Sequence, residues 1–159
     1  MKDIFNSKQI SNETKLRIFN ALIESIFLYN CEVWTVTKAI EKDIDIFQRN
    51  LLRRILNIKW SDKVSNEKLY EKTKTKRWSE KIKKRRLSWF GHLCRLPENC
   101  PAKQALYEAL KPAKKPRGRP LFTWLELITN QVKELDFDNI YDAIEFARDR
   151  QLWKSKTNT

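Results

Sequence analysis

Apolar residues recur at helical spacing in two neighbouring stretches near the start of the chain. The first begins after Ser11 or Asn12, either of which can cap a helix, and fades near Asn30. The second extends from residue 38 to 56, with Thr37 as its cap. Spacings of three and four residues place side chains on one helix face, so the two stretches predict a helical hairpin. The apolar positions are Leu16, Phe19, Ile23, Ile26 and Phe27 in the first stretch and Ile40, Ile44, Phe47, Leu51 and Ile55 in the second.

The stretch from residue 78 to 96 predicts a helix with an apolar and a cationic side. Its apolar arc contains Trp78, Ile82, Leu87, Trp89, Phe90, Leu93 and Cys94. The opposite side carries Lys81, Lys84, Arg85, Ser88, His92 and Arg95. Such a helix packs through its apolar arc and presents its cations to solvent. Lys83 and Arg86 fall within the apolar arc, and we expect their long side chains to reach out to water.

Shorter patterns predict helices at 66–73, 102–110, 122–135 and 140–153, the last capped by Asp138 or Asn139. The segment 111–120, KPAKKPRGRP, predicts an extended connector because prolines and glycine do not continue a helix. No stretch alternates with a period of two, so no sheet is expected. We therefore predict an all-α protein of six or seven helices. Its parts are a helical hairpin (1–74), a basic helical region (75–110), the basic connector (111–120) and a C-terminal helical pair (121–159).

The net charge of the chain comes from one segment. The 159 residues include 33 Lys or Arg and 20 Asp or Glu, which gives a net charge of +13. Between Lys72 and Arg119 there are 16 basic and 3 acidic residues, and the rest of the chain is neutral. A concentrated positive field attracts a polyanion, and nucleic acid is the usual one. We expect the cationic helix face to contact phosphates, with Lys72, Lys74, Lys76 and Arg77 extending its field.

The connector carries a second candidate binding segment, made up of Lys114, Lys115, Arg117, Gly118 and Arg119. It is similar to the core of an AT-hook. Gly118 allows a flat backbone, the prolines keep it extended, and the two arginines fit a narrow A·T minor groove. The same arginines can also bind phosphates without sequence preference, and the segment can also be a stiff linker.

Candidate catalytic and metal-binding groups are few. Asp43 and Asp45 lie about 200° apart on a helix, so they cannot share a metal ion, and we expect both to be solvated. The arrangement of His92, Cys94 and Cys100, even with Cys31 added, matches no common zinc site. We expect no catalytic residue, metal or cofactor. We also expect the tryptophans to pack in the core; for Trp34 and Trp60, which lie in connectors, stacking on a base is the alternative.

Neither a signal peptide nor an apolar membrane span is present in the sequence, so we expect no membrane partner. Three cysteines without a CxxC pair are typical of a reducing compartment. The expected location is therefore intracellular, in the nucleus or the cytoplasm, and not secreted.

Several strings, in order along residues 11–154, resemble the C-terminal region of non-LTR (LINE-type) retrotransposon endonuclease–reverse transcriptases. After the tyrosine that corresponds to Tyr29, the family usually has a glycine, whereas this chain has Asn30. The resemblance implies that the N-terminal hairpin is thumb-like and that the chain is a thumb and tail of a longer RNA-directed DNA polymerase. The strings are SNETKLR (11–17), LYNCEVW (28–34), NLLRRILNIKW (50–60), DKVSNEKL (62–69), RRLSWFGHLCR (85–95), RGRPLFTW (117–124) and ARDRQLW (147–153).

The resemblance and the charge together imply a nucleic-acid-binding fragment without its own polymerase centre. Its expected ligand is DNA or RNA, as a template–primer duplex or target DNA, and the missing palm domain is a further expected partner. Three alternatives remain: a host-used DNA-binding adaptor built on the RGRP segment, a retroelement relic without a function, and a module that binds an acidic protein.

Replacing both Arg117 and Arg119 with Ala distinguishes the adaptor from the thumb. An adaptor is expected to lose its preference for A·T-rich duplex together with most of its affinity. A thumb that binds phosphates is expected to lose affinity partially and equally for all sequences. Competition titrations with A·T-rich and G·C-rich duplexes of equal length measure the difference.

Overall fold

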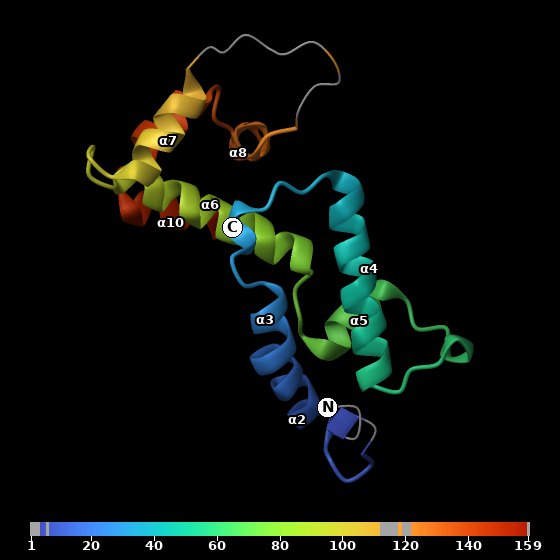
Figure 1. Cartoon of the computed structure of the whole chain (residues 1–159). Helices are drawn as coiled ribbons and strands as arrows, with labels where there is room; N and C mark the ends of the chain where they lie inside the picture. The colour runs from blue at the N-terminus through green and yellow to red at the C-terminus, as the bar shows by residue number, and fades with distance from the viewer. Residues whose placement is uncertain (1–3, 6, 112–117, 119–121, 159) are drawn as a thin grey trace. The chain divides into compact units, whose positions relative to one another are not determined.

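The structure is a computed structural model that describes residues 4–5, 7–111, 118 and 122–158. All regular secondary structure in this part of the chain is helical, which confirms the all-α class (Figure 1). None of its helices is both long and apolar enough to cross a membrane. The elements are α2 (Asn12–Ile18), η1 (Phe19–Glu24, a π-helical stretch), α3 (Ser25–Phe27), η2 (Cys31–Val33), α4 (Lys38–Ile55), η3 (Trp60–Asp62), α5 (Asn66–Thr73), α6 (Trp78–Arg95), α7 (Pro101–Leu110), α8 (Trp124–Lys133), α9 (Ile140–Phe146) and α10 (Arg150–Thr157).

Side-chain caps set the start of several helices, as the sequence predicts. The hydroxyl of Ser11 accepts a hydrogen bond from the backbone N–H of Thr14 at the start of α2. Ser65 caps α5 in the same way, and Asn139 caps α9. A cap satisfies backbone N–H groups that have no partner in the first turn, so it marks the helix boundary in the sequence itself.

The predicted helix 140–153 is instead two helices, α9 and α10. A continuous helix would join the N–H of Gln151 to the carbonyl of Ala147. Both groups have other partners: the Asp149 carboxylate accepts from the Gln151 N–H at 2.7 Å, and the Arg95 guanidinium donates to the Ala147 carbonyl at 2.6 Å. The C-terminal part of the chain is therefore three helices, α8 to α10, and the predicted pair is wrong on this point.

The chain forms two compact units, which are described separately. The first unit contains residues 1–30 and 38–81, and the second contains residues 31–37 and 82–159. The division falls after Lys81, within α6, whereas the first predicted boundary follows residue 74. Each unit contains its own group of buried aromatic and aliphatic side chains.

Trp78 is the centre of the first unit. Its side chain is fully buried and stacks on Phe27, with ring centroids 4.3 Å apart, and on Phe19 at 5.8 Å. The indole Nε1 donates to the Glu24 carboxylate at 2.9 Å, so the buried ring has no unsatisfied donor. Phe47 touches the same ring but is 46% exposed, and Ile40 is 44% exposed; the predicted apolar face of α4 is therefore only partly buried.

Two polar side chains of α4 are buried instead, and they cap α6. Asp45 accepts from the backbone N–H of Ser79 at 3.0 Å and from its hydroxyl at 2.7 Å. Gln48 accepts from the backbone N–H of Trp78 at 3.0 Å and donates to the carbonyl of Lys76. The expectation that Asp45 is solvated is wrong, because the start of α6 supplies the donors that its carboxylate needs. Asp43 is exposed, as expected.

The apolar arc of α6 packs in the second unit against α8, α9 and α10. Phe90 and Leu93 lie in one buried cluster with Ile128, Val132 and Trp153. Trp153 lies directly against Gly91, where an added Cβ would be 2.3 Å from the indole Nε1, so no larger residue fits without movement.

The two basic residues of the apolar arc behave differently. Lys83 reaches out of the arc and pairs with Glu134, as expected. Arg86 does not reach water: its side chain is fully buried and donates to the carbonyl of Trp34 at 3.3 Å. The expectation that Arg86 reaches solvent is therefore wrong, because a backbone carbonyl lies within range of its buried guanidinium.

Replacing Asp45 with Ala is expected to lower the free energy of unfolding by about 2–3 kcal/mol, because two hydrogen bonds to a buried carboxylate are lost. Replacing Asp43 with Ala, on the same helix but exposed, is expected to change it by less than about 0.5 kcal/mol. Urea titrations of both variants measure these values. Equal effects of the two substitutions would show that the cap does not stabilise the fold.

Candidate nucleic-acid interface

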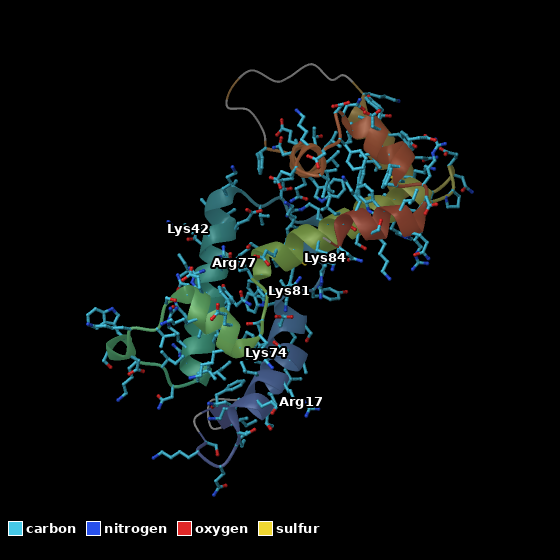
Figure 2. The ribbon with its side chains drawn as sticks, turned by 180° about the vertical axis from the view of Figure 1, so that it is seen from behind. Arg17, Lys42, Lys74, Arg77, Lys81 and Lys84 are labelled. Carbon is cyan, nitrogen blue, oxygen red and sulfur yellow. The ribbon has the colours of Figure 1, made fainter. Side chains whose placement is uncertain are left out.

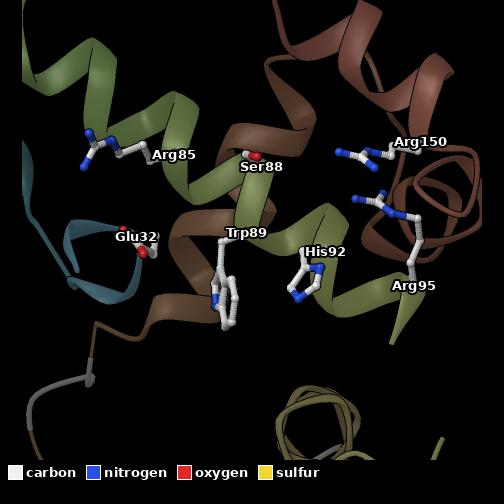
Figure 3. Close-up of a pocket in the computed structure, with 7 residues that line it drawn as sticks. All are labelled: Glu32, Arg85, Ser88, Trp89, His92, Arg95 and Arg150. Carbon is white, nitrogen blue, oxygen red and sulfur yellow. The ribbon is translucent and has the colours of Figure 1, made fainter. Parts of the chain in front are cut away.

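An open groove of about 650 Å³ follows the outward side of α6 in the second unit (Figure 3). Arg85, Ser88, His92 and Arg95 of the predicted cationic face all line it, because their spacing keeps them on one side of the helix. The remaining lining residues are Glu32, Trp89 and Arg150. Within the described part of the chain, three arginines and one histidine therefore line the groove together with one carboxylate.

Two guanidinium groups lie at one end of the groove. Arg95 comes from the last turn of α6 and is half-buried, since one of its Nη atoms donates to the Ala147 carbonyl. Arg150 comes from the first turn of α10 and is exposed; Figure 3 shows its side chain extending beside that of Arg95. Among the described residues, no carboxylate forms an ion pair with either arginine.

The middle of the groove combines a hydroxyl with two rings. Ser88 is exposed, and its side chain lies between the two arginine ends of the groove in Figure 3. The rings of Trp89 and His92 are 5.3 Å apart and inclined by 38°. This part of the groove can therefore offer a hydrogen-bonding hydroxyl, an imidazole and an aromatic surface to a ligand.

Arg85 and Glu32 lie at the other end. One Nη atom of Arg85 is 3.9 Å from the Sγ of Cys31, for which it is a donor. Glu32 belongs to η2 and is the acidic residue among the described residues that line the groove. The positive charge is therefore less compensated near Arg95 and Arg150 than at this end.

The two remaining residues of the predicted helix face lie outside the groove lining. Lys84 is exposed. The Nζ of Lys81 is 2.6 and 2.7 Å from the two carboxylate oxygens of Glu24, so an acid from a distant helix neutralises this lysine within the first unit. Lys74 and Arg77, labelled with Lys81 in Figure 2, are exposed in the segment before α6.

Most of the predicted connector segment lies outside the described residues. This applies to Lys114, Lys115, Arg117 and Arg119. Gly118 is described: it is exposed and has a φ of 120°, a conformation that favours glycine.

Sequence reasoning missed Glu32 and Arg150, and assigned Trp89 to the core alone. Neither Glu32 nor Arg150 belongs to the helix whose face predicted the site. Both residues do lie in strings used for the family resemblance, Glu32 in LYNCEVW and Arg150 in ARDRQLW, but no local pattern relates these strings to α6. Only the packing of α10 on α6 brings the two arginines together.

The chain is similar to an uncharacterized, transposon-derived protein of Caenorhabditis elegans. The two are 23% identical over 158 residues, which covers 93% of this chain and 56% of the relative. The chain thus spans little more than half of the length of that relative. A family model for a domain of unknown function (DUF6451) matches residues 1–29, and no solved structure is significantly similar. The relationship indicates a transposon-related origin.

The three cysteines are free thiols in different surroundings. Cys31 and Cys94 are buried and Cys100 is half-buried. Burial raises the pKa of Cys94 to about 11 and also raises the pKa of Cys31, although the charge of Arg85 opposes the shift at Cys31. Within the described residues, no three His, Cys, Asp or Glu side chains are grouped so that they could hold a metal ion.

Cys100 is expected to react first with a thiol reagent in the folded protein. At about pH 8 a thiol with a pKa near 11 is only about one-thousandth thiolate, and the thiolate is the reactive form. Titration with a chromogenic disulfide is therefore expected to modify one thiol rapidly, and three after denaturation. Loss of the rapid phase in a Cys100→Ser variant checks the assignment, whereas rapid modification of Cys94 would contradict it.

Proposed function

We propose that this chain is the nucleic-acid-binding C-terminal part of a non-LTR retrotransposon reverse transcriptase. It contacts a template–primer duplex or target DNA through phosphates and has no polymerase centre of its own. The observation that supports this most is the groove on α6, where Arg85, Arg95 and Arg150 face one open space with one carboxylate among the lining residues.

The groove has the chemistry that a phosphodiester requires. Guanidinium groups donate hydrogen bonds in a planar fork that matches phosphate oxygens, and they remain charged at all physiological pH values. Arg95 is held by its bond to Ala147, so less conformational freedom is lost when its remaining N–H groups bind an anion. Ser88 adds a neutral donor, as is common in contacts to nucleic-acid backbones.

The family resemblance and the groove support each other. The string RRLSWFGHLCR supplies Arg85, Ser88, Trp89, His92 and Arg95, and the distant string ARDRQLW supplies Arg150. A third string, LYNCEVW, supplies Glu32, so three of the strings that resemble reverse transcriptases meet at one site. The transposon-derived relative is consistent with the same origin.

We assign no polymerase activity to this chain. Nucleotide transfer requires carboxylates that converge on two metal ions. Asp45 is occupied by its hydrogen bonds to Ser79, and Asp43 on the same helix is exposed. Under this proposal, catalysis belongs to a palm domain of a longer protein, and that domain is the expected protein partner.

Binding to a duplex is expected to weaken steeply with salt. If about six to eight phosphates are neutralised, the plot of log affinity against log salt has a slope of about −5 to −7. Replacing Arg150 with Ala is expected to make the slope less negative by about 1 and to reduce affinity about tenfold at about 0.1 M salt, equally for different sequences.

Arg148→Ala is the matched control, since Arg148 is exposed, lies two residues before Arg150, pairs with Glu145 and does not line the groove. It is expected to keep the wild-type slope and most of the affinity. A wild-type slope near zero would exclude phosphate binding, and equal losses for both variants would exclude the groove as its site.

A further inference from the structure

Trp60 is the most exposed large hydrophobic residue in the described part of the chain. Its side chain is 94% exposed, in the short helical turn η3 between α4 and α5. The expectation that it packs in the core is wrong. Trp78 and Trp153 are buried, and Trp34, the other connector tryptophan, is half-buried. An indole that meets almost only water retains its whole aromatic surface for a ligand.

Hydrogen bonds hold the backbone that presents Trp60. The Asp62 carboxylate accepts from the N–H of Lys59 at 2.7 Å, and the N–H of Asp62 donates to the carbonyl of Lys59 at 3.1 Å. The N–H of Lys63 donates to the carbonyl of Trp60 at 3.2 Å, with Lys63 in the left-handed conformation at φ 48°. These bonds fix the backbone that carries the exposed indole.

The base of this loop is also fixed. Arg53, near the end of α4, donates to the carbonyl of Val64 at 3.3 Å and to the side chain of Asn66 at 2.9 Å. Both ends of the connection between α4 and α5 are thus joined by one side chain. A platform that is ordered before binding loses little conformational entropy when a ligand stacks on it.

The surroundings of Trp60 are cationic. Lys59 and Lys63 flank the turn and are exposed. From residue 53 to 68 the chain has five basic and two acidic residues, and one of the acids, Asp62, is engaged by the backbone of Lys59. An exposed aromatic ring between cations matches a strand in which bases alternate with phosphates.

We propose that Trp60 is a stacking platform for an unpaired base, and that this turn binds single-stranded nucleic acid. In a duplex the faces of the bases are covered by their neighbours, so an isolated indole gains a partner only from an unpaired base. This proposal rests on the proposed function and adds single-stranded nucleic acid to its ligands. The groove on α6 contacts phosphates, whereas Trp60 contacts a base.

The test measures binding of the whole chain to an oligothymidine of about 20 nucleotides and to an abasic strand of equal length. Trp60→Ala is expected to lose about 5- to 150-fold affinity for oligothymidine and to bind the abasic strand as the wild type does. Trp60→Phe is expected to retain most of the affinity and Trp60→Leu is not, because Leu is apolar but has no aromatic face.

Tyr141→Ala is the matched control, because Tyr141 is 62% exposed and follows a segment with Asp138 and Asn139 rather than lysines. It is expected to leave both affinities unchanged. Unchanged melting temperatures of the variants confirm that folding is not affected, as expected for a side chain that is almost entirely in water.

The proposal is overturned if the wild type binds the two strands equally, if Trp60→Ala keeps its affinity for oligothymidine, or if Trp60→Leu binds as well as Trp60→Phe. These outcomes are independent of the groove, which is tested with a duplex and Arg150→Ala. If the Trp60 variants bind oligothymidine as the wild type does, and the wild type still binds the duplex, only the stacking site is excluded. If the wild type binds neither the two single strands nor the duplex, the proposed function is excluded.

Discussion

Buried hydrogen bonds at the start of α6 determine the arrangement of the first unit. A carboxylate that leaves water destabilises the fold unless its oxygens are bonded, and Asp45 meets this requirement through both donors of Ser79. Gln48 accepts from the N–H of Trp78 in the same way. Because both acceptors are fixed on α4, α6 starts at Trp78 in one rotational setting. That setting directs the indole of Trp78 onto Phe27, and the aromatic core forms around it.

A close contact has the corresponding role in the second unit. Gly91 allows the Trp153 ring to lie against the α6 backbone, and the indole Nε1 donates to the carbonyl of Leu87 at 2.9 Å. This contact places α10 beside α6, so Arg150, one turn before Trp153, reaches the groove that Arg95 lines. The groove is therefore a consequence of core packing, and its cations come from two helices that the core holds together.

The sequence predicts what local signals determine. Helix limits follow from periodicity and caps, as the Asn139 cap of α9 illustrates. The cationic face of α6 is also local, because one helix supplies it. Burial of Asp45 and Arg86, and the approach of Arg150, depend on partners more than thirty residues away that no short pattern relates. The prediction for Trp60 fails for a different reason: hydrophobicity predicts burial, but this residue lies in a turn that is held by local hydrogen bonds, and its side chain remains in solvent.

The position of Arg150 supports the proposal that the groove binds an anion. A cation in the first turn of a helix faces the positive end of the helix dipole, which destabilises it by about 0.3–1 kcal/mol at the surface. Its guanidinium also lies beside that of Arg95, with like charge. Asp149 caps the same helix through the N–H groups of Gln151 and Leu152, so it offsets the dipole but forms no ion pair with Arg150. Under the proposed function, a phosphate that binds between the two arginines relieves their repulsion, so a negatively charged ligand stabilises this arrangement most.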